Sequence, residues 1–84
     1  MRMAPKRIVY LLRSASTGRP YFGLTSNITT RLAAHNAGEN RSTAPFRPWV
    51  LVTLIEFNEE KTAIAFERFL KTGSGRAFVK RHLM

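Results

Sequence analysis

Five of the 84 residues are acidic, and all five are glutamates, so few side chains could hold a metal ion or act as a carboxylate base. Glu59 and Glu60 stand where a helix is expected to begin, and the helix dipole explains anions there. Glu67 lies later in that helix, between Phe66 and Leu70, at the margin of its apolar face. A carboxylate at this margin can reach a shallow site. The alternative is a solvated surface glutamate.

Two basic residues, Arg31 and His35, are four positions apart in another predicted helix and therefore share one face of it. An arginine in that position can bind two oxygens of one phosphate. Two tyrosines, Tyr10 and Tyr21, lie in separate β-prone runs. The alternative interpretations are an exposed basic pair and two aromatic residues of the core or its rim.

A hairpin is predicted near the start of the chain. Residues 7–13 and 20–24 are β-prone and flank a segment rich in Ser, Gly and Pro. The second run is short, follows a proline and contains Gly23, features that are typical of an edge strand. The first strand is therefore expected in the middle of the sheet.

The first helix is predicted from Asn27 to Gly38, because a glycine is a natural C-terminal stop. Either of the two residues before it, Thr25 or Ser26, can be its N-cap. The apolar side is expected from two neighbouring rows of residues, Ile28, Leu32, Ala33 and Ala37.

The rest of the chain predicts a loop, a strand and two helices. Residues 39–48 read as a basic loop, and residues 49–57 form an apolar run typical of a buried strand. Asn58 is the expected N-cap of the second helix, residues 72–75 break that helix, and residues 77–83 can form a short final helix with a basic face. The buried face of the second helix is expected from Ala63, Phe66, Phe69 and Leu70.

These elements predict an α+β fold in one domain, residues 1–84. A three-stranded antiparallel sheet is flanked by helices in the order β-β-α-β-α-α, and residues 1–6 form a loose basic tail. There is no cysteine, which excludes a disulfide scaffold and a thiolate metal site. No apolar run approaches the roughly 20 residues of a membrane helix, so a cytoplasmic protein without a membrane partner is expected.

The charge balance predicts a polyanionic partner. Fourteen lysines and arginines stand against five acids, for a net charge of +9 at pH 7, and nucleic acid is the simplest ligand for such a surface. The cations expected to contact nucleic acid are Arg13, Arg19, Arg41, Arg47, Lys71 and Arg76.

Taken together, these residues resemble the GIY-YIG nuclease superfamily, and the resemblance covers nearly the whole chain. The first motif reads Ile8-Val9-Tyr10 and the second Tyr21-Phe22-Gly23, followed by Arg31, His35 and a later helix with Glu67. The segments 25–35 and 70–76 look closest to small single-domain members related to the N-terminal nuclease domain of excinuclease C.

The resemblance implies metal-dependent hydrolysis of phosphodiester bonds, with DNA favoured over RNA as the substrate and DNA repair as a setting. Tyr10 or Tyr21 would orient or deprotonate the attacking water, and the sequence does not decide between them. Arg31 would supply charge to the phosphate, His35 would relay a proton or orient a tyrosine, and Glu67 would hold the metal. The structural role expected for Gly23 is a bend or a close backbone approach.

The number of carboxylates favours one particular version of this chemistry. A two-metal site needs several carboxylates, whereas Mg²⁺ or Mn²⁺ in a one-metal site can use a single carboxylate, water and substrate phosphate. A one-metal mechanism on Glu67 is therefore the better prediction. The rival function is a nucleic-acid-binding module on the same scaffold, without catalysis.

Overall fold

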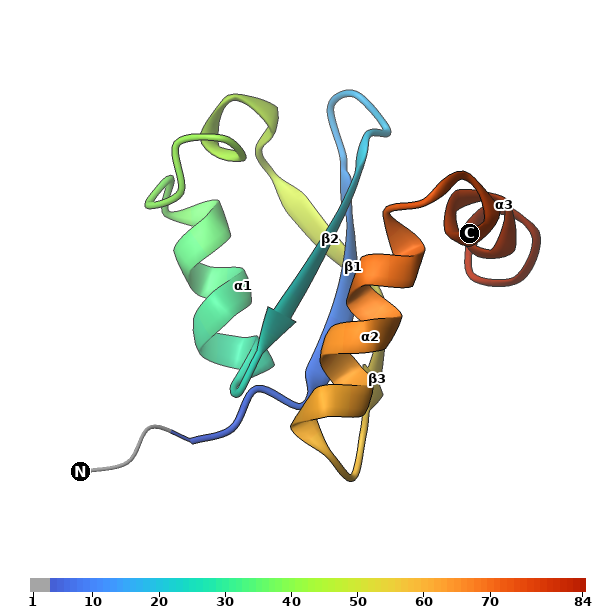
Figure 1. Cartoon of the computed structure of the whole chain (residues 1–84). Coiled ribbons are helices and arrows are strands. Elements are labelled where there is room, and N and C mark those ends of the chain that lie inside the picture. The colour runs from blue at the N-terminus through green and yellow to red at the C-terminus, as the bar shows by residue number, and fades with distance from the viewer. Residues whose placement is uncertain (1–3) are drawn as a thin grey trace.

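The sheet separates two layers of helices in the computed structural model, which describes residues 4–84 (Figure 1). Its strands are β1 (Ile8–Ser14), β2 (Pro20–Thr25) and β3 (Trp49–Glu56), antiparallel in the order β2-β1-β3. The predicted α+β class, the order of the elements and the central position of the first strand are confirmed.

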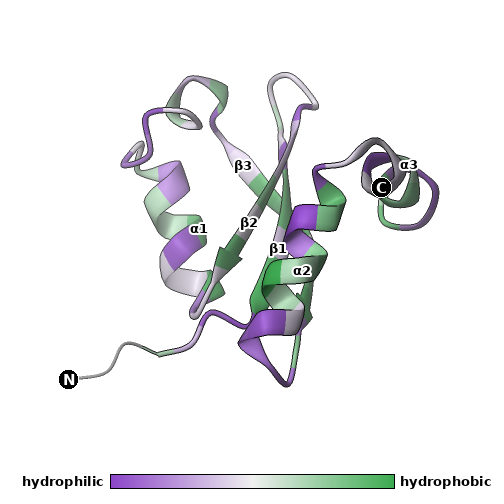
Figure 2. Ribbon diagram, viewed as in Figure 1, coloured by the Kyte–Doolittle hydropathy of each residue, from purple (hydrophilic) through white to green (hydrophobic). Residues whose placement is uncertain are grey.

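Strand β1 sends alternate side chains to the two faces of the sheet, as a strand of period two must. Val9 and Leu11 face helices α2 and α3, whereas Tyr10 and Leu12 face α1. The larger core lies on the α2 and α3 side. Its buried members are Val9, Leu11, Ala63, Leu70 and Val79. Figure 2 shows hydrophobic residues in the middle of α2 and hydrophilic residues at its start.

Strand β3 is less buried than its apolar run predicted. Val50 is 48 % exposed and Leu54 40 % exposed, although Trp49 is buried. The reason is the sheet order, because β3 is the second edge strand and only β1 has a neighbour on both sides.

Helix α1 (Ile28–Asn36) is capped by Asn27, whose side chain accepts a hydrogen bond from the backbone N–H of Thr30. The predicted cap at Thr25 or Ser26 is therefore wrong. The Thr25 hydroxyl is engaged elsewhere, since it bonds to both backbone groups of Asn27 and closes the turn from β2. Because Asn is as favourable an N-cap as Ser, the sequence alone does not distinguish Ser26 from Asn27 as the cap of α1.

The buried side of α1 also differs from the prediction. Ala33 and Ala37 are exposed, and the covered stripe consists of Ile28, Leu32 and His35 at the spacing i, i+4, i+7. The prediction from apolar residues alone misplaced the buried face of α1, because the most buried residue of that face is a histidine. The helix therefore brings a titratable ring into the core.

Helix α2 (Glu60–Leu70) buries Ala63 and Leu70 as predicted, but its N-cap is Glu59, in extended backbone without a side-chain cap bond. The predicted Asn58 cap is wrong because the helix begins one residue too late for that side chain. Phe69 was expected on the buried face but stays at its margin, 38 % exposed.

Helix α3 (Gly73–His82) begins four residues earlier than predicted. Thr72 caps it by accepting from the N–H of Gly75, and its hydroxyl donates to the Phe69 carbonyl at the end of α2. A Cβ on Gly75 would overlap that same carbonyl oxygen. The segment 72–75 is therefore not a loop, because Gly75 lets α3 start directly against the end of α2.

The segment between α1 and β3 contains a 3-10 turn, Ala44–Phe46. Asn36 fixes the start of β3, since its side chain donates to the Trp49 carbonyl at 3.0 Å and accepts from the Trp49 N–H at 2.7 Å. The Trp49 indole N–H donates to the Thr43 carbonyl at 2.9 Å. The predicted loop is thus held firmly beside α1.

The start of the chain is tied to α2 where the structure describes it. The backbone N–H of Lys6 donates to the Glu60 carboxylate at 2.8 Å, so the predicted loose tail is anchored at its last residue. Residues 1–3 of that tail lie outside the described residues. None of the helices in residues 4–84 is long and apolar enough to cross a membrane.

Candidate active site

Tyr10 is the central residue of the site, and its ring lies against the backbone of the edge strand β2. It pairs with Gly23 across the β1–β2 ladder, and a Cβ at Gly23 would overlap the Tyr10 ring and hydroxyl. Any other residue at position 23 would displace this ring. The close backbone approach expected at Gly23 is therefore present, and its cause is the tyrosine of the neighbouring strand.

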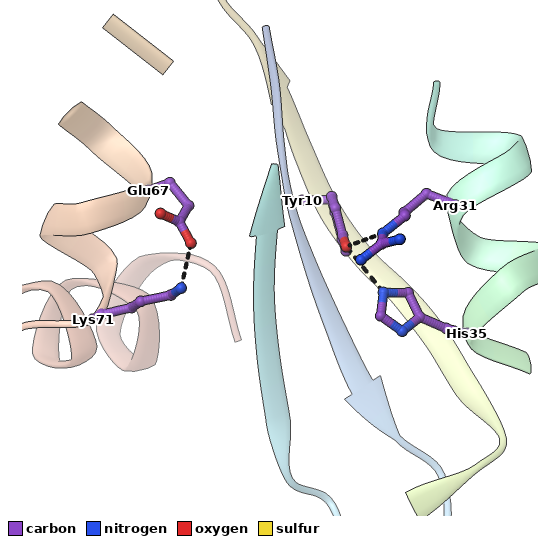
Figure 3. Close-up of polar contacts among 5 residues, drawn as sticks. All are labelled: Tyr10, Arg31, His35, Glu67 and Lys71. Atoms are coloured by element: carbon purple, nitrogen blue, oxygen red, sulfur yellow. Dashed lines mark hydrogen bonds and ion pairs between the residues drawn. The ribbon is translucent and has the colours of Figure 1, made fainter. Parts of the chain in front are cut away.

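The Tyr10 hydroxyl joins two residues of α1 (Figure 3). It accepts from Arg31 Nε at 3.2 Å and lies 2.9 Å from His35 Nε2. His35 Nδ1 lies 2.8 Å from the Thr43 hydroxyl, which in turn donates to the Asn40 carbonyl at 3.4 Å. This order fits one tautomer, in which Nδ1–H donates to Thr43 and Nε2 accepts the Tyr10 proton.

Burial sets the protonation states along this chain of bonds. The pKa of His35 is lowered from its ordinary value of 6.5, mainly by burial and to a lesser degree by the charge of Arg31. The ring is therefore neutral at pH 7. Burial raises the pKa of Tyr10, although the hydrogen bond from Arg31 opposes this. The same bond is the main cause that raises the pKa of Arg31, which remains a cation.

Arg31 is a half-buried cation that no carboxylate neutralises in the part of the chain that the structure describes. Its Nε is committed to Tyr10, which fixes the direction of the guanidinium. A partly desolvated arginine without an acidic partner is a strong receptor for a phosphate group. This arrangement is therefore suited to binding an anion.

Tyr21 completes an aromatic wall beside this cation. Its ring meets the His35 ring edge-on, with centroids 5.0 Å apart, and its centroid lies 6.3 Å from that of the Tyr10 ring. Tyr21 also contributes, as a lesser cause, to raising the pKa of Arg31. The Tyr21 ring is half-buried, and its hydroxyl is not held between two partners as that of Tyr10 is within residues 4–84. Of the two tyrosines, Tyr21 has the freer hydroxyl.

Glu67 lies on α2, across the edge strand β2 from Tyr10 and Arg31 (Figure 3). Its side chain is 15 % exposed and forms an ion pair with Lys71, one helical turn later. Glu67 also contributes to raising the pKa of Tyr10, so the charge of the Glu67 carboxylate acts on Tyr10 across β2. The carboxylate and the arginine thus flank β2 from opposite faces of the sheet.

Three of the six cations expected to contact nucleic acid line one groove together with Tyr21. Arg19, Lys71 and Arg76 border a cavity of about 640 Å³ between β2 and α3. The other three lie elsewhere: Arg13 borders a separate hollow beside β3, and Arg41 and Arg47 are exposed in the segment after α1. Arg47 is partly structural, since its Nε donates to the Ala44 carbonyl at 2.8 Å.

Thr43 is the functional residue that the sequence did not reveal. It belongs to a predicted loop, yet it is 3 % exposed and holds both the His35 ring and the Trp49 indole. Its only signal is the histidine eight residues earlier, which needs a partner if it is buried. Local patterns do not show that burial.

A search against protein-family models matched residues 6–81 to the GIY-YIG catalytic domain. Searches of curated proteins and of solved structures gave no match. The family-model match covers all the candidate site residues and extends from just before β1 to the last turn of α3.

The buried neutral His35 predicts a pH-dependent stability. Because its pKa is lower in the folded chain than in the unfolded one, its contribution is complete above pH 6.5 and is lost as the pH falls through the folded pKa. His35→Gln keeps one polar partner but cannot be protonated. We expect the wild-type Tm to fall more than that of the variant between about pH 7.5 and 5. Parallel Tm curves would show that His35 does not titrate in this window.

Proposed function

Because the chain belongs to the GIY-YIG family, whose members are generally nucleases, we propose that it is a divalent-metal-dependent endonuclease that cleaves nucleic acid. The observation that supports this best is the Arg31 guanidinium, fixed on the Tyr10 hydroxyl beside Tyr21 and paired with no carboxylate in residues 4–84. The preference for DNA over RNA and a setting in DNA repair rest on the resemblance to the excinuclease domain alone.

Arg31 is proposed to bind the phosphate and to stabilise the charge that develops on it. The Tyr10 bond restricts the rotation of the guanidinium, so little reorganisation is needed when the phosphate oxygens gain charge. The neutral His35 and the chain to Thr43 hold the Tyr10 hydroxyl in place. His35 and Tyr10 are thus positioning residues for Arg31 in this mechanism.

Tyr21, in preference to Tyr10, is proposed to orient the attacking water. The Tyr10 oxygen accepts from Arg31 and donates to His35, and the residue is 1 % exposed. Burial also raises the pKa of Tyr10, which disfavours its loss of a proton. Tyr21 is less buried than Tyr10 and borders the groove, where water and substrate can reach it.

The donor chemistry of Glu67 fits Mg²⁺ or Mn²⁺. A hard divalent ion can use one carboxylate and complete its shell with water and substrate phosphate. No cluster of three acidic or histidine side chains occurs in residues 4–84, so Glu67 is proposed to act as a single protein ligand. A cation already pairs with this carboxylate, namely the Lys71 ammonium. When bound, the metal would supply charge stabilisation at the phosphate.

The Glu67–Lys71 pair predicts competition between lysine and metal. Lys71→Met should strengthen Mn²⁺ binding to the free protein about twofold, because an i, i+4 pair contributes about 0.3–0.5 kcal/mol. Glu67→Gln should abolish Mn²⁺ binding while the fold is kept. Titration calorimetry measures both.

Lys61→Met is the matched control, because Lys61 pairs with Glu59 at 3.9 Å on the exposed start of the same segment. Its Mn²⁺ affinity should equal that of the wild type. Unchanged Mn²⁺ binding in a folded Glu67→Gln variant would contradict the assignment of Glu67 as the metal ligand.

The two tyrosines should respond differently to loss of the hydroxyl. Tyr21→Phe should lower the single-turnover cleavage rate by about 10²-fold or more with little change in Tm, since the group acts on the water. Tyr10→Phe should lower the Tm, because it leaves His35 and Arg31 without a buried partner, at a cost of about 1–3 kcal/mol. If Tyr10→Phe keeps its Tm but loses as much rate as Tyr21→Phe, the two roles are misassigned.

Variants of Arg31 distinguish an enzyme from a binding module that does not catalyse. A phosphate-binding arginine in a binding module contributes equally to every bound state, whereas an arginine aimed at the cleaved phosphate acts mainly in the transition state. We expect Arg31→Ala to cut the single-turnover rate by about 10²–10³-fold and to change affinity much less. Arg31→Lys should restore little, since lysine lacks the forked geometry.

Arg41→Ala is the control for this experiment, because Arg41 is exposed and belongs to the segment after α1. It should weaken affinity more than it lowers the rate. If both alanine variants lose rate only in proportion to affinity, Arg31 has no catalytic role and the binding-module function is favoured.

A further inference from the structure

The groove between β2 and α3 has two chemically different parts. Its rim carries four cations from three parts of the chain, and no acidic residue lines it. Its floor is largely apolar and includes Phe22 and Val79 of the α2 and α3 face, whereas Tyr21 lines the groove from β2 while its ring packs on the α1 face. We name it the β2–α3 groove and define it by its lining residues, Arg19, Pro20, Tyr21, Phe22, Lys71, Arg76, Val79, Lys80 and Met84.

We propose that the β2–α3 groove binds an unpaired strand of nucleic acid next to the phosphate that is cleaved. Its rim would contact the phosphates, and its apolar floor would be covered by an unstacked base. The proposal rests on the nuclease function proposed above, because it places part of the substrate beside Tyr21.

The shape of the groove favours an unpaired strand over a duplex. A duplex presents phosphates to a basic surface but keeps its base faces stacked inside, so it would leave the apolar floor uncovered. An unpaired strand offers both phosphates and free base faces, and proteins bind it by combining a basic groove with apolar platforms. A volume of about 640 Å³ leaves room for a nucleotide with its base turned inward.

The basic rim is held rigidly enough to act as a binding surface. Arg76 and Lys80 are four residues apart on α3, so both lie on the same face of that helix. The position of α3 is fixed by the Thr72 cap and by Gly75, which packs directly on the end of α2. This turn therefore sets the distance between the two α3 cations and the edge strand.

The groove also adjoins the proposed site at two points. Tyr21 belongs to its wall, and Lys71 belongs to its rim while pairing with Glu67. A phosphate on the rim would attract Lys71 away from the Glu67 carboxylate. A bound strand would thus reach the tyrosine on one side of β2 and the carboxylate on the other.

The test measures binding in EDTA, where no cleavage occurs. Fluorescence anisotropy compares an oligothymidylate of about 15 nucleotides, an abasic strand with the same phosphates, and a duplex of equal length. We expect the thymidylate to bind at least about fivefold more tightly than the abasic strand, because stacked bases contribute on that scale. The duplex should bind less tightly than the thymidylate at equal salt.

Two variants probe the rim and the floor separately. Arg76→Ala should weaken both single strands and reduce the salt slope of log K by about 0.7, the value for one phosphate contact on a single strand. Arg81→Ala is the matched control, because it removes the same charge from the same helix but Arg81 borders a different hollow. This variant should keep the wild-type salt slope. Met84→Ala should weaken only the thymidylate.

Equal binding of the thymidylate and the abasic strand, or identical slopes for Arg76→Ala and Arg81→Ala, would overturn the groove assignment. Neither result depends on catalysis. Cleavage of DNA in Mg²⁺ by a protein that fails this test would leave the nuclease function standing. Conversely, the expected binding pattern without cleavage would contradict the proposed function alone.

Discussion

The site depends on one buried contact, the Tyr10 hydroxyl held between Arg31 Nε and His35 Nε2. This contact needs a glycine on the neighbouring strand, since a Cβ at Gly23 would occupy the space of the tyrosine ring. It also needs a neutral histidine, which burial and the nearby arginine provide by lowering the pKa of His35. The cationic arginine is thereby fixed without a carboxylate among the described residues, and its charge stays available for an anionic ligand.

Part of this arrangement could be predicted from the sequence. The proline and glycine of β2 predict an edge strand and hence the central position of β1, whereas the apolar run of β3 predicts a strand but not its place at the second edge of the sheet. The resemblance to the family rests on Tyr10, Tyr21, Arg31 and Glu67 at their spacings, and the family model matches the segment that contains them. The errors fall where two neighbouring residues are equivalent caps, as at the start of α1, or where glycines begin a helix instead of ending one, as at the start of α3.

The burial of His35 and its contact with Thr43 could not be predicted, for a physical reason. Hydrophobic periodicity identifies a buried face by its apolar members, and here the deepest residue of α1 is a histidine with polar partners at both ring nitrogens. One partner comes from the loop after the helix, whose position depends on Asn36 and Trp49. That contact exists only after the tertiary fold has formed. The choice between the tyrosines depends on the same burial, and the sequence therefore left it open.

The edge position of β2 explains why the site can be shared by two faces of the sheet. In the middle of a sheet, a strand would separate α1 from α2 completely. At the edge, Arg31 on one side and Glu67 on the other flank a single strand, and the charge of Glu67 still acts on Tyr10.

An unpaired edge strand usually favours association with another strand. Pro20 and Gly23 weaken that tendency here, and the flanking cations of the β2–α3 groove favour a polyanion along this edge. Pro20 and Gly23 thus keep other strands from this edge, and the cations beside it would favour the unpaired nucleic acid proposed above.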